Sequence, residues 1–400
     1  MSDQRTTNSN DDHLWLETPL IYSKHISAVL GANIYLKLDV SILCSCKFVM
    51  LSTDLLSTQF LQPSYSFKYR GLSYFIQDAL RTHGTDVHLV VASGGNAGLA
   101  VACVAKALRL HCTVYLPRGA SASTLELFEQ EGANVKEEGA YYQEALAAAE
   151  ETVRSEPNAV MVPAYDHPLL WEGHASMIEE TARQLPEGTK PDAVVCCVGG
   201  GGLGAGVMVG CKNVGWDDVP FVAMETRGSN CFYQSLALNP GPFVSSPQPA
   251  HAGVQVLHDE TYDVTYAKLP KLTSRASSLG ASWPSPGAVK MALGREGGVK
   301  SVCVSDEMAM QTALSFANDH KILVELACAT TLVSAYSPTL FDKLVPPKPS
   351  GAPRTVVFIV CGGFKISLEE LTEYRSVLRS EKSEHWDVLC NGEQWSIPKQ

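Results

Sequence analysis

The stretch VHLVVASGGNAGLAVACVAKALRLHCTVYLP, residues 87–117, decides the fold. Its two ends are short apolar runs typical of buried strands, VHLVVAS at 87–93 and CTVYLP at 112–117. Between them, apolar residues recur at helical spacing, at Leu99, Val101, Ala102, Ala105 and Leu108. A strand, a helix and a second strand in this order predict two parallel strands joined by a crossover helix.

The same alternation continues on the C-terminal side. Helical patterns at 123–132 and 141–156 are separated by a strand-like run, and the strand AVMVPAY follows at 159–165. A second series begins with the helix 167–185 and includes the strands DAVVCC, PFVAMET and TVVFIVCGG. The sequence therefore predicts an α/β fold of open, mostly parallel sheets with helices on both faces, in one large domain or two interleaved ones.

Composition excludes several classes of function. The 400 residues are 45% hydrophobic and 18% charged, as in globular proteins, and the net charge of −11 comes without any block of Lys and Arg. Neither a nucleic acid nor an anionic membrane is therefore expected as a partner. The N-terminus lacks the basic and apolar parts of a signal peptide, and the twelve cysteines form no paired zinc pattern. We expect a soluble, cytoplasmic protein.

The first chemical motif is QPSYSFKYRG at 62–71, which contains a lysine. A lysine that forms a Schiff base needs an amine that is held in place and partly desolvated. The flanking Phe67 and Tyr69 are bulky enough to do this for Lys68. An isolated lysine is usually a surface cation, so the interpretation of Lys68 depends on the motifs that accompany it.

The second motif is SGGNAG at 93–98, between a predicted strand and a predicted helix. Glycines there let the backbone approach a ligand closely, and the start of the helix offers unpaired N–H groups suited to a carboxylate. Asn96 adds a side-chain amide. The alternative is an ordinary strand-to-helix turn that the asparagine caps.

The third motif is a run of four glycines at 199–202, after the strand DAVVCC and before a helix. Such a loop forms a backbone nest for a phosphate. It lacks the spacing and the lysine of nucleotide hydrolases, whereas a dinucleotide-binding interpretation stays open because Glu225 follows near the expected distance. The fourth motif is Cys361 with two glycines at the end of the last predicted strand, where open α/β sheets bind ligands.

All four motifs, in this order, resemble those of the serine/threonine dehydratase family of pyridoxal-phosphate enzymes, which have fold type II. The likeness runs from about Thr18 to about Leu371 and includes YLKLD, WEGHAS and AMET. The cysteine in VCGG is similar to the residue found at this place in the eukaryotic L-serine dehydratase branch. The resemblance implies a large catalytic domain formed by residues 1–39 and 166–400, and a small domain formed by residues 40–165.

The resemblance also implies a role for each motif. Lys68 would hold pyridoxal 5′-phosphate as a Schiff base and afterwards abstract the α-proton of the substrate, while Cys361 would contact the pyridine nitrogen. Phe67 would pack on the cofactor ring, and Asn96 would bind its hydroxyl group. The phosphate would lie on the backbone amides of Gly199, Gly200, Gly201, Gly202 and Leu203. The substrate carboxylate would bind to Ser93, Gly94 and Asn96.

The implied activity is that of an L-serine/L-threonine ammonia-lyase, which forms pyruvate or 2-oxobutyrate and ammonia from a small amino acid, in a catabolic, gluconeogenic homodimer. A monovalent cation such as K⁺ at Glu225 is implied as well, and a solvated carboxylate is the alternative. Serine racemase, D-serine dehydratase and cysteine synthase-like activities remain open. So does a non-catalytic paralogue or mis-spliced product.

Three segments depart from a compact domain. Residues 1–14 are expected to form a disordered tail, and residues 238–266, rich in proline and glycine, a long surface loop. Residues 41–60 are surplus to the family pattern, in which YLKLD reaches QPS after about two residues, so they are predicted to be an insertion or a retained intron. Tyr65 stands where relatives have glycine, which is costly if the turn needs a positive φ there.

Overall fold

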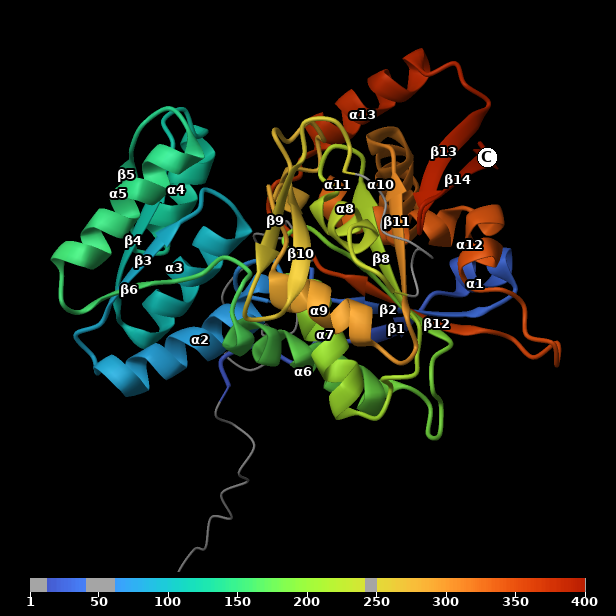
Figure 1. Ribbon diagram of the computed structural model, residues 1–400, viewed down its shortest axis with the longest axis horizontal. Coiled ribbons are helices and arrows are strands. Elements are labelled where there is room, and N and C mark those ends of the chain that lie inside the picture. Colours follow the sequence, from blue (N-terminus) through green and yellow to red (C-terminus); the bar gives the residue numbers. More distant parts are fainter. Residues whose placement is uncertain (1–12, 41–61, 242–249, 400) are drawn as a thin grey trace, which may run out of the picture.

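The computed structural model describes residues 13–40, 62–241 and 250–399, and two sheets dominate it (Figure 1). The smaller sheet has four parallel strands in the order β5-β4-β3-β6. They are β3 (His88–Ala92), β4 (His111–Leu116), β5 (Asn134–Glu137) and β6 (Ala159–Met161). Helices α3 (Asn96–Leu108), α4 (Ala122–Gln130) and α5 (Tyr142–Ser155) surround this sheet. These elements follow the alternation that the sequence predicts.

The larger sheet has eight strands in the order β1-β2-β12-β7-β8-β11-β13-β14. Its centre is parallel and consists of β2 (Asn33–Leu38), β12 (Thr355–Val360), β7 (Ala193–Cys197), β8 (Phe221–Thr226) and β11 (Val299–Val304). Antiparallel strands complete both edges: β1 (Leu20–Tyr22) at one, and β13 (His385–Cys390) with β14 (Glu393–Pro398) at the other.

Helices cover both faces of the larger sheet (Figure 1). One side carries α6 (Pro168–Gln184), α7 (Gly202–Asn213) and α9 (Pro286–Gly294), and the other carries α10 (Asp306–His320), α11 (Leu326–Leu332) and α13 (Leu368–Ser380). The remaining helical segments are α1 (Lys24–Leu30), α2 (Lys68–His83), α8 (Cys231–Ala237), α12 (Pro338–Leu344), η1 (Ser277–Leu279) and η2 (Val333–Tyr336). The predicted α/β architecture of open, mostly parallel sheets with helices on both faces is confirmed.

The central strands are continuous apolar runs because helices bury both of their faces. All residues of β7 and β12 are buried, and so are those of β3 in the smaller sheet. The apolar side chains of both sheets join into one main core, with a small separate cluster under α5. Each sheet therefore presents the carboxyl ends of buried parallel strands as rigid supports for a site.

The strands of the smaller sheet all lie within residues 40–165, the range predicted for the small domain, and those of the larger sheet all lie outside that range. The domain boundaries themselves stay a prediction. Residues 1–12 of the predicted tail and the predicted insertion at 41–60 lie outside the described residues.

The segment 238–266, expected to be a surface loop, is partly regular. It contains β9 (Gln255–Asp259) and most of β10 (Val264–Lys268), which form an antiparallel hairpin. The prediction of a loop is wrong for these strand residues, because β10 packs against α8 and α9 and buries Val264. Proline and glycine content alone did not reveal that contact.

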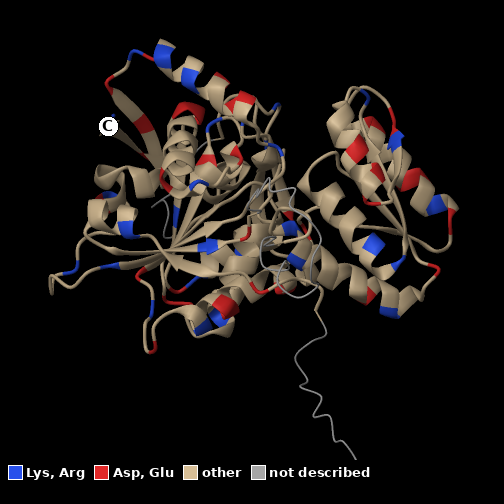
Figure 2. Ribbon diagram, turned by 180° about the vertical axis from the view of Figure 1, so that it is seen from behind, with Lys and Arg blue, Asp and Glu red and all other residues tan. Residues whose placement is uncertain are grey.

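Charged residues lie mainly on the outer surface. Both acidic and basic side chains lie along α13 and along the helices around the smaller sheet (Figure 2). In the part of the chain that the structure describes, we find no helix with the length and apolar character needed to cross a bilayer.

Candidate active site

The turn before α2 is hydrogen-bonded to the end of β12. The N–H of Phe67 donates to the carbonyl of Cys361 at 3.0 Å, and the N–H of Gly363 donates to the carbonyl of Tyr65 at 2.8 Å. Lys68 is the first residue of α2. It therefore lies at the carboxyl end of a central parallel strand, where open α/β sheets bind ligands.

The amine of Lys68 is held and partly desolvated, as the sequence predicts. Its Nζ donates to the carbonyl of Ala164 and lies 5.3 Å from the centroid of the Phe67 ring. Burial lowers the pKa of Lys68 from 10.5 to about 8, and the nearby Cys361 only partly offsets this effect. A pKa near 8 leaves part of the amine unprotonated at neutral pH, as a nucleophile requires.

The glycine loop lies between β7 and α7. Gly201 has a φ of 93° and caps α7, which begins at Gly202. The first hydrogen bond inside this helical turn runs from the N–H of Ala205 to the carbonyl of Gly201. The N–H groups before Ala205, including that of the buried Leu203, therefore have no helical acceptor and are suited to an anion.

The loop must be made of glycine because its surroundings leave no room for side chains. A Cβ atom on Gly200 would lie 2.6 Å from the ring of Tyr165, and one on Gly202 would lie 2.6 Å from the carbonyl oxygen of Tyr165. A Cβ atom on Gly199 would lie 2.9 Å from the backbone of Leu279. These contacts fix the backbone of the loop, and because glycine has no side chain, the loop itself does not cover its own amides.

Asn96 begins α3 and contacts the larger unit. Its Nδ2 donates to both oxygens of Glu325, at 3.1 and 3.2 Å, and to Ser278 Oγ at 3.3 Å. Its Oδ1 accepts the N–H of Phe364 at 3.2 Å. Burial raises the pKa of Glu325. Asn96 thus joins the small-sheet unit to the end of β12 and to a buried carboxyl group that the sequence analysis missed.

The loop that precedes Asn96 is the predicted binding site of the substrate carboxylate. Ser93 follows β3, and its Oγ accepts the N–H of Gly95 at 3.3 Å. Gly94 follows in the sequence, and a Cβ atom on it would lie 3.4 Å from the Cβ atom of Leu116. The loop is therefore tightly folded, and its backbone N–H groups lie at the start of α3.

Cys361 lies beside a second cysteine at the ends of β12 and β7. Its sulfur is 3.5 Å from the sulfur of Cys197, and both residues are buried. Hydrogen bonds to Cys197 and Cys328, together with burial, raise the pKa of Cys361 well above its usual value. The thiol therefore keeps its proton and is a neutral polar group at the site.

A closed series of contacts joins the four predicted motifs. Lys68 contacts Ala164, and the adjacent Tyr165 contacts the glycine loop. The loop contacts Leu279, and the adjacent Ser278 contacts Asn96, which reaches the end of β12 through Phe364. The turn before Lys68 is itself bonded to that strand end. The structure therefore brings together the residues predicted from the four separate motifs.

Glu225, the predicted cation ligand, lies at the end of β8. Its carboxylate is buried and accepts the N–H of Phe232 at 3.0 Å and that of Tyr233 at 2.7 Å. Burial raises its pKa well above the usual value, and the two backbone donors oppose this shift. Glu225 is thus a buried group with backbone partners, not the solvated carboxylate that was the alternative.

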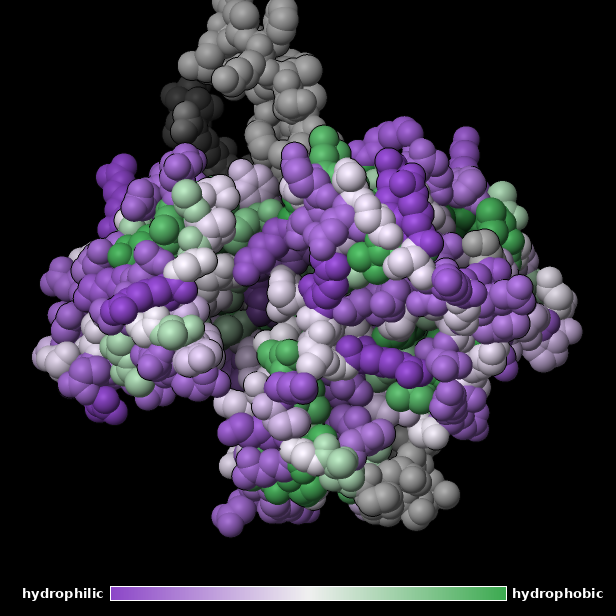
Figure 3. Space-filling view, turned by 90° about the horizontal axis from the view of Figure 1, so that it is seen from above, coloured by the Kyte–Doolittle hydropathy of each residue, from purple (hydrophilic) through white to green (hydrophobic). Residues whose placement is uncertain are grey.

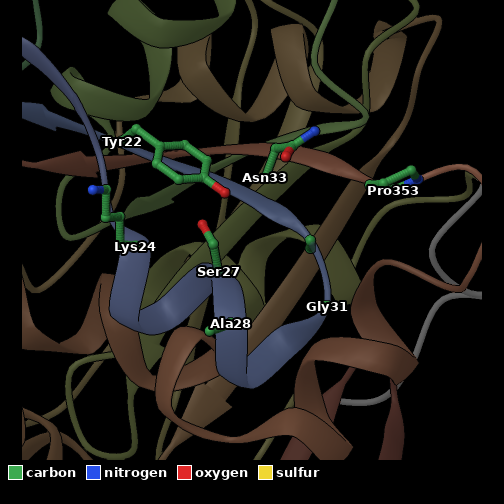
Figure 4. A pocket seen from close by; sticks show the side chains of 8 residues that line it. Tyr22, Lys24, Ser27, Ala28, Gly31, Asn33 and Pro353 are labelled. Atoms are coloured by element: carbon green, nitrogen blue, oxygen red, sulfur yellow. The ribbon is translucent and has the colours of Figure 1, made fainter.

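The surface is hollowed between the part of the molecule built on the smaller sheet and the part built on the larger sheet (Figure 3). A second hollow lies at α1 and the start of β2, and its lining includes Tyr22, Lys24, Ser27 and Asn33 (Figure 4). No residue of the four motifs lines it. We therefore place the candidate site at the junction of the two units.

Comparison with known proteins identifies relatives along most of the chain. The family described as pyridoxal-phosphate dependent enzyme matches residues 58–362. The L-serine dehydratase/L-threonine deaminase of Homo sapiens is 35% identical over 370 residues, covering 91% of this chain and 96% of the human protein. The serine dehydratase-like protein of Mus musculus is 37% identical, covering 90% and 93%. A solved structure, the fungal L-serine ammonia-lyase from Rhizomucor miehei, has a TM-score of 0.73 at 30% identity, covering 91% of this chain and 99% of that chain.

Proposed function

The chain belongs to the family of pyridoxal-phosphate dependent enzymes, and from this premise we propose that it is an L-serine/L-threonine ammonia-lyase. It would convert serine to pyruvate and threonine to 2-oxobutyrate, with release of ammonia. The observation that carries the proposal is the closed series of contacts among Lys68, the glycine loop, Asn96 and the end of β12. The similarity to the human and fungal proteins gives the substrate class.

The residues at the site fit pyridoxal 5′-phosphate, the cofactor of this family. The loop at 199–202 offers backbone amides to a phosphate, and Asn96, whose amide donates to Glu325 here, would exchange that partner for a ring hydroxyl. Next to Lys68, the hydroxyl groups of Ser64 and Ser66 are buried and have no hydrogen-bond partner among the described residues. Buried hydroxyl groups without partners are rare and indicate a polar group that belongs beside them.

The roles of the side chains follow from their environments. When bound, the cofactor withdraws electrons from the α-carbon of an amino acid. Lys68 would hold it through its amine and would take up the α-proton of the substrate, for which a pKa of about 8 is suited. Cys361 would offer a neutral thiol to the pyridine nitrogen. Ser93, Gly94 and Asn96 would orient the carboxylate.

The decisive experiment tests whether Lys68 holds the cofactor. The purified protein should show the visible absorbance of a Schiff base, and borohydride should abolish it. Lys68→Ala should lack that absorbance, whereas Lys212→Ala, a change at an exposed lysine at the far end of α7, should keep it. Visible absorbance that survives in Lys68→Ala would disprove the assignment.

A second assay tests the substrate class. Keto-acid formation should be measured with L-serine, L-threonine and D-serine, and cysteine formation with O-acetylserine plus sulfide; only L-serine and L-threonine should react at appreciable rates. Turnover of D-serine alone, or of O-acetylserine with sulfide, would assign the chain to another reaction within the same family. Formation of D-serine from L-serine without pyruvate would indicate a racemase.

Three finer features complete the proposal. The enzyme would work in the cytoplasm, in amino-acid catabolism that supplies gluconeogenesis, and it would be a homodimer, which size-exclusion chromatography with light scattering can test. Glu225 would hold a monovalent cation, so exchanging K⁺ for a larger organic cation should lower activity reversibly. The buried position of Glu225 supports this role, because a buried carboxylate favours a positively charged neighbour.

A further inference from the structure

His174, in the middle of α6, is hydrogen-bonded to the first turn of α2. The side chain is fully buried, and its Nδ1 accepts the N–H of Gly71 at 3.2 Å. Regular helix geometry would direct that N–H to the carbonyl of Phe67. That carbonyl accepts the N–H of Arg70 instead, at 3.1 Å. The imidazole thus takes the place of a backbone acceptor in the turn that begins with Lys68.

This hydrogen bond defines the protonation state of the imidazole. A backbone N–H can only donate, so Nδ1 carries a lone pair and the single proton is on Nε2. Nε2 is buried and has no partner among the described residues. Burial lowers the pKa of His174 well below 6.5, and the positive charges of Lys68 and Arg70 lower it further. The ring is therefore neutral in the pH range in which Lys68 titrates.

Three helices meet at this ring. A Cβ atom on Gly71 of α2 would lie 2.6 Å from the carbonyl oxygen of Leu170 and 2.7 Å from Nε2 of His174. A Cβ atom on Gly206 of α7 would collide with the Cβ of His174. The centroid of the Phe67 ring is 4.9 Å away, with the two planes tilted by 61°. The ring therefore contacts α2 and α7, two of the three helices whose first turns form the candidate site.

We propose that His174 is a positioning residue: by accepting the Gly71 N–H, the neutral imidazole fixes the first turn of α2 so that the amine of Lys68 stays desolvated next to Ala164. His174 acts through the backbone and does not itself contact substrate. The proposal rests on the proposed function only in naming Lys68 as the reacting amine. Its test needs no turnover.

The competing explanation is that the ring only fills space between helices. Any uncharged side chain of similar volume would then replace it. Our proposal instead requires an acceptor attached directly to Cγ, where Nδ1 is attached. Asparagine offers such an acceptor, whereas glutamine is closer in volume to histidine but carries its amide one carbon further out. The two explanations therefore rank His174→Asn and His174→Gln in opposite orders.

The experiment measures the pKa of Lys68 in the full chain freed of cofactor. The rate at which an amine-specific acylating reagent modifies Lys68 is followed against pH by peptide mass spectrometry. In His174→Asn the pKa should remain near the value of about 8 in the unaltered protein. In His174→Gln it should rise by about one pH unit, because a loosened first turn exposes the amine to water. The rate of cofactor capture near neutral pH should fall correspondingly, about tenfold.

Two results would overturn the proposal. One is a Lys68 pKa in His174→Gln equal to that of the unaltered protein, and the other is an equal shift in both variants. Should either variant fail to fold, nitrogen NMR of the unaltered protein labelled in histidine decides the matter. An unprotonated Nδ1 at His174 is expected at every pH at which the protein is folded, and a protonated Nδ1 would contradict the geometry on which the proposal depends.

Discussion

Tyr65 adopts a backbone φ of 61°, in the left-handed region that a Cβ atom makes costly. The turn before Lys68 therefore has a positive φ at Tyr65, which is the condition under which a tyrosine was expected to be costly there. The half-buried ring of Tyr65 packs against the core, which compensates part of that cost. Tyr65 therefore stores backbone strain three residues before Lys68.

Glycine and alanine at position 65 separate the backbone effect from the packing effect. Tyr65→Gly and Tyr65→Ala both remove the ring, but only alanine keeps a Cβ atom at a φ of 61°. We expect Tyr65→Ala to be less stable than Tyr65→Gly by about 1 kcal/mol, measured as the free energy of unfolding in urea. Equal stability of the two variants would show that the turn relaxes to a negative φ.

The lowered pKa of Lys68 predicts a pH dependence in the cofactor-free protein. Below pH 8 the rate of cofactor capture should rise about tenfold per pH unit, and above that pH it should level off, because only the unprotonated amine reacts. The free energy of unfolding should also rise with pH. Between pH 8 and 10.5 the unfolded chain holds the Lys68 proton and the folded chain does not, so raising the pH favours the folded state.

A capture rate that kept rising to pH 10 would mean that the amine is solvated. Lys68→Ala is the control for stability, since it should lack the part of the pH dependence that belongs to this amine. Both measurements use protein without substrate, so they are independent of which amino acid the enzyme prefers.

At the scale of elements, a buried group of charges connects β2, α2 and α6. Arg70 donates to Asp39 at 2.7 Å and to Glu180 at 2.5 Å, and Lys37 donates to Glu180 at 2.6 Å. All four side chains are buried. Two positive and two negative charges balance, so the group is stable only while every partner is present. It fixes the start of α2 against α6 only two residues beyond Lys68.

Breaking this group should therefore be costly. Glu180→Gln keeps the shape of the side chain but leaves Arg70 and Lys37 with one negative partner, and we expect a loss of about 3–5 kcal/mol of unfolding free energy. Glu151→Gln, which breaks an exposed pair with Arg154 on α5, is the matched control and should cost less than about 1 kcal/mol. Similar effects of the two changes would show that water reaches the buried group.

The alternating elements were predictable because buried parallel strands and crossover helices have distinct apolar periods. The β9–β10 hairpin was not predictable from the sequence, since its burial depends on contacts with α8 and α9, outside the hairpin.

At the site, the four motifs were found because runs of glycine and a lysine between aromatic residues are unusual. Ala164 was missed because it contributes a backbone carbonyl, a role that any residue type can fill, and Tyr165 was missed because its ring and carbonyl contact the glycine loop only in the folded chain. Glu325 was missed because its partners, Asn96 and Lys365, come from distant segments.

At the scale of the whole molecule, the described residues on either side of the segment 41–61 lie against the same strand end. Val40 and the carbonyl of Tyr65 both contact Gly362, and Gln62 is buried and hydrogen-bonded to Leu16. The chain therefore leaves and re-enters the fold at neighbouring places. A connection there can change in length without moving either end.

Excision of residues 41–60 should consequently leave the fold intact. We expect the shortened protein to bind cofactor as the full chain does and to unfold at an equal or higher urea concentration, because a shorter connection loses less entropy on closing. Visible absorbance after reconstitution and urea denaturation of both proteins would check this. Loss of cofactor binding on excision would show that the segment belongs to the working enzyme and is not a passenger.

The pairing of β2 with β12 sets an order of events during synthesis. One edge of β2 pairs with β1, but the other edge finds its partner only at residues 355–360, so the larger sheet cannot close until nearly the whole chain has left the ribosome. The smaller sheet, by contrast, draws all its strands from residues 88–161 and can form while translation continues. The nascent chain thus carries a finished small sheet and, at the same time, an apolar strand with one open edge. During that interval the open edge of β2 is available for pairing with other chains, whatever the stability of the finished enzyme.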